Sequence, residues 1–310
     1  MSRARTASLP TETLLFGAAS CLAILILGPL SLPMPFVLQV GLLGVAVIVL
    51  GLPHGALDSW IAARAGLYRR PLGWIGFNLA YVLLALAVIV FWWLSPLLAL
   101  SLFLLISAWH FAADWRATLP LWQRLSAGLA LLGMPAVFHP EAVAGIFMTL
   151  SGSAAAAVAE GLRIIGLAAL ATLVPVLLLT AHRRQYAALI ELALLPVLAA
   201  AAPPLLYFAL YFCLLHSPRH LRATLELAPP RQRRSLIRSL IAQASLYTLA
   251  TLVLAALAAA IFLPAGSLSE QALRLVFIGL AALTVPHMLL MLWTERTAPE
   301  ALEVMHRPAG

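Results

Sequence analysis

Residues 73–94, GWIGFNLAYVLLALAVIVFWWL, form a run of 22 residues without a charged side chain. About 20 apolar helical residues match the thickness of the hydrocarbon core of a bilayer, so this run predicts a transmembrane helix. The rest of the chain has the same character: 63% of its 310 residues are apolar, 10% are charged, and the mean hydropathy is +1.02. Soluble domains are about half apolar and about a quarter charged. The composition therefore excludes a water-soluble globule, a disordered chain and a fibrous protein.

Nine further apolar runs flank residues 73–94, and together they predict an all-α fold, a polytopic transmembrane helical bundle of about ten spans. The predicted segments are 13–30, 35–52, 73–94, 97–113, 121–138, 161–181, 187–202, 204–217, 238–263 and 271–293. The seventh and eighth are short and divided by Ala202-Pro203-Pro204. If they form one re-entrant hairpin, eight full spans remain. We expect a single integral-membrane domain over residues 1–310, with short cytoplasmic tails at 1–12 and 295–310.

The basic residues predict the orientation of this bundle. All 19 of them are arginines. With the N-terminus in the cytoplasm, 17 arginines fall on the cytoplasmic side, and only Arg163 and Arg274 fall outside. Arginine and lysine gather in the cytoplasmic loops of membrane proteins, so both termini are expected in the cytoplasm. We therefore expect a multi-pass protein of the cell (inner) membrane whose positive charge contacts the lipid bilayer and binds no nucleic acid.

Five of the eight histidines lie in or at the ends of apolar segments. They are His54 in GLPHGALD (51–58), His110 in SAWHFAAD (107–114), His216 and His220 in HSPRH (216–220), and His287 after Pro286. The predicted spans that carry them all run from outside to inside, which places the five imidazoles at a similar depth. Imidazole is a common ligand of iron, copper, nickel and zinc. Ionisable groups inside a membrane are costly and mark functional sites. The histidines therefore predict a shared metal site.

Two aspartates follow the first two histidines at helical spacing. Asp58 is four residues after His54, and Asp114 is four residues after His110. Residues four apart share one face of a helix. Ligating histidines usually donate their second ring N–H to a carboxylate or carbonyl. We expect each aspartate to orient its own histidine or one across the bundle; the alternative is that both are ordinary helix-end charges in water.

Aromatic residues surround the same level of the predicted bundle. Most are expected in an interfacial belt or in packing, and some are candidates for the wall of an apolar substrate channel. The channel candidates are Trp109, Phe111, Tyr207, Tyr211 and Phe212. The other histidines, His139, His182 and His306, are not assigned to the site.

The four histidine motifs, taken together, resemble the Brp/Blh family of membrane-bound β-carotene 15,15′-dioxygenases, which are linked to rhodopsin systems. The resemblance runs from residue 51 to residue 288, and only Ala112, where we expect glycine, departs from it. It implies a non-haem Fe²⁺ cofactor, O₂ and β-carotene as substrates, two molecules of all-trans-retinal as product, and a possible functional link to a rhodopsin. The implied iron ligands are His54, His110, His216 and His220, with Asp58, Asp114 and His287 around them.

Three other classes remain open on the residues alone. A di-iron membrane desaturase or hydroxylase needs about eight histidines in HxxxH and HxxHH boxes, whereas this chain has one HxxxH and no HxxHH. A non-enzymatic transporter would use the histidines as a transient metal or proton path. A haem protein would use two of them as axial ligands.

Overall fold

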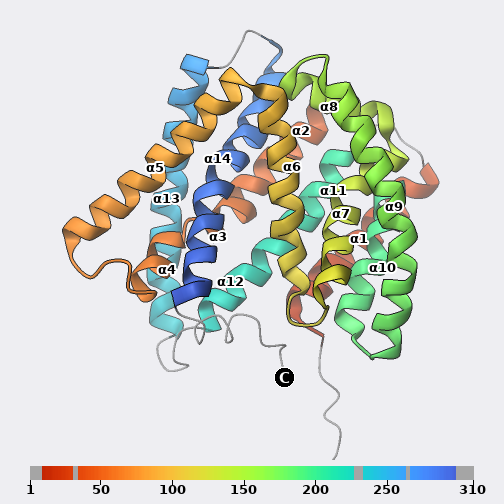
Figure 1. Cartoon of the computed structure of the whole chain (residues 1–310), viewed down its shortest axis with the longest axis horizontal. Coiled ribbons are helices and arrows are strands. Elements are labelled where there is room, and N and C mark those ends of the chain that lie inside the picture. Colours follow the sequence, from red (N-terminus) through yellow and green to blue (C-terminus); the bar gives the residue numbers. More distant parts are fainter. Residues whose placement is uncertain (1–8, 31–33, 227–232, 263–265, 298–310) are drawn as a thin grey trace, which may run out of the picture.

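The computed structural model describes residues 9–30, 34–226, 233–262 and 266–297, and within these ranges it is built of helices without a strand (Figure 1). The N-terminal elements are α1 (Thr11–Leu30), α2 (Phe36–Ala46), η1 (Val47–Gly51), α3 (Leu52–Gly55), α4 (Asp58–Arg64), α5 (Pro71–Leu94), α6 (Pro96–Ala112) and η2 (Ala113–Trp115). The central elements are α7 (Leu121–Phe138), α8 (Pro140–Ser151), α9 (Ala155–His182) and α10 (Tyr186–Ala201). The C-terminal elements are α11 (Pro204–Tyr211), η3 (Phe212–His216), α12 (Ser217–Glu226), α13 (Arg233–Phe262) and α14 (Leu268–Thr297).

The all-α prediction is confirmed, and each of the ten predicted segments corresponds to helical structure. Proline starts several of the helices, among them α5 at Pro71, α6 at Pro96 and α11 at Pro204. Proline suits the first helical turn because its ring fixes φ and its missing N–H has no partner to lose there. The predicted tails at 1–12 and 295–310, with the arginines and His306 in them, fall largely outside the described residues.

Five described helices are long and apolar enough to cross a membrane: α1, α5, α6, α9 and α14. A sixth span results if α7 and α8, which meet at an angle of 107°, are one broken span. The apolar helices Phe36–Gly51, Tyr186–Ala201 and Ile241–Leu257 are shorter. The helices thus indicate a membrane protein, while ten spans and cytoplasmic termini stay predictions.

Helix α8 is absent from the predicted segments. It has 12 residues, which is too short for a search based on spanning length to find. The sharp bend lies between α7 and α8 at His139. At Ala202-Pro203, where the sequence suggests a hairpin, α10 ends and α11 begins.

The helices form a compact half and a more open half (Figure 1). In the compact half α7, α9 and α10 pack against one another, and α1 packs on α10. A Cβ on Gly133 would lie 2.5 Å from Gly166 of α9, so α7 and α9 cross at a distance that only glycine permits. In the other half α5 packs mainly on α14, and Trp92 is its single buried residue.

Two π-helical turns lead into the histidine motifs. One is η1, just before α3 with His54, and the other is η3, which ends at His216. The two turns are in contact. A Cβ on Gly51 would lie 2.7 Å from the Phe212 ring, so glycine is needed for this approach. Single π-turns are frequent at functional sites because the extra residue redirects side chains.

Candidate metal centre

Four of the five motif histidines have described side chains, and these lie together at the centre of the bundle. The ring centroids of His110 and His216 are 4.7 Å apart, those of His110 and His287 are 5.3 Å apart, and those of His220 and His287 are 5.0 Å apart. The rings come from α6, η3, α12 and α14, so residues more than 170 positions apart in the sequence meet here. The fifth residue, His54, lies in α3, but its side chain is outside the described part of the structure.

His216 is held by a carboxylate across the bundle. Its Nδ1 lies 3.1 Å from both carboxylate oxygens of Asp114, which also accepts a hydrogen bond of 2.5 Å from the Tyr211 hydroxyl. Because the carboxylate only accepts hydrogen bonds, Nδ1 carries the hydrogen and donates it. Nε2 then keeps its lone pair, which is the form that can bind a metal ion. Asp114 thus supports His216 of η3, across the bundle.

His287 is held in the same way on the other side of the site. Its Nδ1 lies 2.9 Å and 3.0 Å from the two carboxylate oxygens of Asp58, and the Tyr81 hydroxyl donates to the same carboxylate at 2.8 Å. Both Asp58 and His287 are buried. The two aspartates therefore serve histidines across the bundle, because Asp58 begins α4 and Asp114 lies in η2, each beyond the end of the helix that carries the preceding histidine.

The donor set suits a metal ion that prefers imidazole. The Nε2 atoms of His110 and His216 are 3.1 Å apart. Two imidazole nitrogens bound to one ion at about 2.1 Å are separated by about 3.0 Å at a right angle and about 3.4 Å at the tetrahedral angle. Among the side chains that the structure describes, no three histidines, cysteines or carboxylates form a complete metal-binding group. Further ligands would come from His220, His287 or His54.

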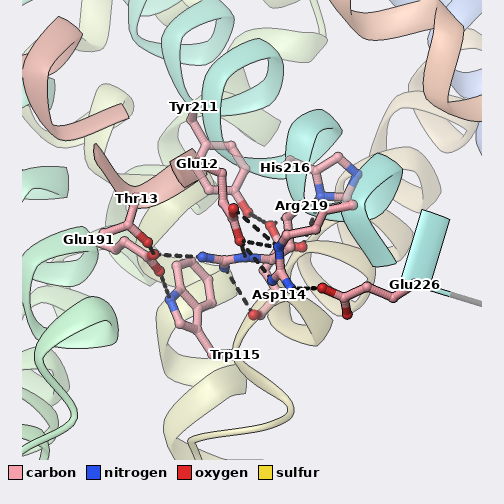
Figure 2. A network of polar contacts seen from close by, with 10 residues as sticks. Glu12, Thr13, Asp114, Trp115, Glu191, Tyr211, His216, Arg219 and Glu226 are labelled. Carbon is pink, nitrogen blue, oxygen red and sulfur yellow. Dashed lines mark hydrogen bonds and ion pairs between the residues drawn. The ribbon is translucent and has the colours of Figure 1, made fainter. Parts of the chain in front are cut away.

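A buried network of charges surrounds the Asp114 side (Figure 2). Arg219 lies in its centre, between His216 and His220 in the sequence. Its guanidinium donates to Glu191 Oε1 at 2.5 Å and to the Asp114 carbonyl at 3.0 Å, and it lies 3.7 Å from Glu12. Further members are Thr13, Trp115, Arg222 and Glu226.

This network ties the histidine-bearing helix α12 to three other elements. Glu12 comes from α1, Glu191 from α10 and Asp114 from η2, and the two glutamates are 2% and 1% exposed. Burial by itself lowers the pKa of the Arg219 guanidinium, but Glu191, Asp114 and Glu12 outweigh this effect and hold the pKa above its ordinary value. Arg219 is therefore charged in the folded protein, and it fixes α12 against the compact half.

Neither Arg219 nor the glutamates Glu12 and Glu191 belong to the site residues predicted from the sequence. A signal was present for Glu191, since it is the single acidic residue in the apolar run 187–202, and a lone charge in such a run marks a buried partner or a site. Arg219 carried a weaker signal, because an arginine at a helix end also fits the cytoplasmic side. Only the fold shows that the two residues meet.

An apolar cavity of about 410 Å³ borders the histidines. Small-molecule sites occupy about 300–1,000 Å³. Its wall comes from α3–α6, η3, α11, α13 and α14, and it includes His110 and His287 but neither His216 nor His220. The exposed side chains of this wall are all on α5 and α13, namely Trp74, Leu86, Leu246, Ala250 and Leu254. The cavity therefore opens between these two helices.

The five candidate channel residues divide into two groups. Phe111 and Phe212 line the cavity, together with Phe208. Trp109 is 45% exposed on the outer surface of α6, whereas Tyr207 and Tyr211 are buried away from the cavity. Of the histidines outside the motifs, His139 contacts the Ala199 carbonyl at 2.9 Å, and His182 is exposed at the end of α9.

The described side chains thus form a cluster of carboxylate-oriented histidines beside an apolar cavity, in a bundle that contains several helices of membrane length. Comparison with known proteins supplies the family. The model of the β-carotene 15,15′-dioxygenase family matches residues 45–295, and the chain therefore belongs to this family. It is 34% identical over 252 residues to a β-carotene 15,15′-dioxygenase of the uncultured marine bacterium 66A03. The aligned region covers 79% of this chain and 90% of that protein. No solved structure matches.

The family assignment confirms the resemblance seen in the four motifs. It supports an oxygenase that cleaves carotene. All five motif histidines and both aspartates lie within the matched residues.

Proposed function

We propose that this chain is an iron-dependent enzyme that cleaves the central 15,15′ double bond of β-carotene with O₂ and releases two molecules of all-trans-retinal. The observation that supports this most directly is the position of His110 at the wall of an apolar cavity, 3.1 Å from a second imidazole nitrogen. A polyene hydrocarbon needs an apolar site, and O₂ chemistry needs a metal at its wall. The relative from the marine bacterium is named for this substrate.

In this proposal His54, His110, His216 and His220 hold Fe²⁺. Bound iron supplies the activation of O₂, which a protein side chain does not provide. Asp114 holds the His216 ring by its Nδ1–H, so that Nε2 is directed toward the other imidazoles. Such carboxylate–histidine pairs fix both the tautomer and the ring orientation of a ligand.

The cavity residues would position the polyene and exclude water. Phe111, Phe208 and Phe212 form an aromatic wall beside His110. The rings of Phe208 and Phe212 are stacked at 5.4 Å, and Phe111 meets Phe212 edge to face at 6.3 Å. A wall of this kind holds a flat conjugated chain by dispersion and keeps water from the reacting carbons. No side chain needs to move a proton to or from the alkene.

The opening between α5 and α13 offers a path from the bilayer. The exposed wall residues there are mostly apolar, and α5 is the helix with the fewest buried residues among the five of membrane length. β-Carotene dissolves in the hydrocarbon core and not in water, so lateral entry between helices suits it. We place the enzyme in the cell membrane with about ten spans and both termini in the cytoplasm, where its product can supply a rhodopsin.

Product analysis in a β-carotene-producing host tests the proposal. Cells that express the chain should lose β-carotene and accumulate retinal, measured by chromatography of extracted pigments. His110→Ala should accumulate no retinal at equal membrane expression, because it removes a ligand at the cavity wall. Unchanged β-carotene with confirmed expression of the unaltered chain contradicts the proposal, and so does a purified protein that binds no iron.

A further inference from the structure

We infer that His287 binds the metal ion directly, as an additional imidazole ligand that α14 presents and Asp58 orients. The inference rests on the proposed function, because it assumes the same iron site. It adds a ligand to the four that the family motifs imply, on the side of the site that borders the cavity.

The first support is the position of the ring. The His287 centroid lies 5.3 Å from that of His110 and 5.0 Å from that of His220. With metal–nitrogen bonds of about 2.1 Å, two imidazoles on one ion have ring centres about 4.6 Å apart at a right angle and about 5.3 Å apart at the tetrahedral angle. The His110–His216 pair falls in this range at 4.7 Å. His287 therefore lies within this range of two proposed ligands, at distances slightly longer than that of the His110–His216 pair.

The second support is the orientation of the ring. Asp58 accepts the Nδ1–H of His287, which leaves Nε2 as a lone-pair donor on the far side of the ring. Asp114 does the same for the proposed ligand His216. Each carboxylate is also bound by a tyrosine hydroxyl, from Tyr81 and Tyr211. The same arrangement of tyrosine, aspartate and histidine thus occurs twice. A carboxylate that accepts the second N–H is the usual partner of a histidine that binds a metal.

The third support is the location of His287 relative to the cavity. His287 and His110 both line it, whereas the His216 and His220 side chains do not. His287 is 4% exposed and bonded to a carboxylate that is 2% exposed. A purely structural histidine would satisfy this aspartate without also contacting two other imidazoles, those of His110 and His220. As a ligand, His287 would determine which side of the ion the substrate meets.

Metal binding by the purified, full-length protein tests this assignment. The protein is stripped of metal with a chelator and titrated anaerobically with Co²⁺, whose visible absorption depends on the number and geometry of its ligands. His287→Ala should weaken Co²⁺ binding by about tenfold or more and change the absorption bands. Asp58→Asn should weaken it by about 10–100-fold, which is the usual effect of losing the carboxylate partner of a ligand.

Three comparisons make the outcome decisive. His182→Ala removes an exposed histidine at the end of α9 and should bind Co²⁺ like the unaltered protein. His287→Gln keeps most of the side-chain volume. If His287→Ala does not fold, the two single variants His287→Gln and Asp58→Asn take its place. If His287→Gln or His287→Ala keeps the original affinity and absorption bands, the inference is wrong while the proposed function stands. If the unaltered protein binds neither Co²⁺ nor Fe²⁺, both the inference about His287 and the proposed function are wrong.

Discussion

The two sides of the histidine cluster have the same three-residue arrangement in different surroundings. On one side Tyr211 and His216 share Asp114, and on the other Tyr81 and His287 share Asp58. The Asp114 side is enclosed by the buried charges around Arg219, in contact with the compact half. The Asp58 side borders the cavity and the open half. Under the proposed function, the enclosed side would hold the site in place and the side at the cavity would receive the substrate.

This division has a physical reason. Buried charges need several partners at once, so a network such as that of Arg219 forms where helices from separate parts of the chain are fixed together. A cavity needs a wall that can part for a large apolar ligand. Helix α5, which has a single buried residue, suits that role.

The largest expected effect concerns the enclosed side. Arg219→Ala leaves Glu191 buried without its cation, whereas Glu12 keeps its ion pair with Arg222, and loss of one partner of a buried pair costs about 3–5 kcal/mol. Thermal unfolding of the purified protein in detergent should show a strongly lowered transition temperature. Arg163→Ala is the control, because its pair with Glu160 is exposed and its removal should change nothing measurable. Equal transition temperatures for Arg219→Ala and the unaltered protein would show that the network does not stabilise the fold.

The second effect concerns the open side. Ala250→Trp places a large ring at the exposed edge of the cavity on α13 and should reduce β-carotene cleavage about a hundredfold, equivalent to about 2.7 kcal/mol. Bound iron should remain unchanged, because Ala250 lies at the opening and not among the histidines. The matched control is Leu249→Trp, since Leu249 is 61% exposed and does not line the cavity. If both variants cleave β-carotene equally well, the substrate does not enter between α5 and α13.

The smallest effect compares the two tyrosines directly. Tyr211→Phe removes a hydrogen bond to a carboxylate in a fully enclosed position and should lower stability by about 1–2 kcal/mol. Tyr81→Phe removes the equivalent bond of a side chain that is only partly buried, so the loss should be smaller, about 0.5 kcal/mol. Chemical denaturation of the two variants measures the difference. Equal losses would mean that the two sides are equally enclosed.

Much of the fold is predictable from sequence because a bilayer sets a simple rule. A helix that crosses the hydrocarbon must be apolar along its length, and residues 73–94 show this without any knowledge of their neighbours. This rule does not predict helix α8, because its 12 residues are too few to cross the hydrocarbon core. Its break from α7 lies at His139-Pro140, and it packs against α9.

The histidines were identifiable as a site because imidazoles are rare in apolar helices. Asp58 and Asp114 were identifiable as their partners, but the pairing of each aspartate with a particular histidine was not. Spacing suggests that Asp58 supports His54 and Asp114 supports His110, or that each reaches across the bundle; the structure shows the second arrangement. The helix containing each histidine ends before the aspartate, so the rule for residues four apart in one helix does not hold there.

The amino-acid sequence by itself determines that this chain is a helical membrane-type protein with a group of imidazoles in or beside its apolar segments, because hydropathy and residue type are properties of the chain. The tertiary structure alone decides which carboxylate holds which histidine, that Arg219 meets Glu191, and which aromatic rings face the cavity. These are contacts between segments far apart in the sequence. They depend on the angles at which helices cross, and no local pattern encodes these angles.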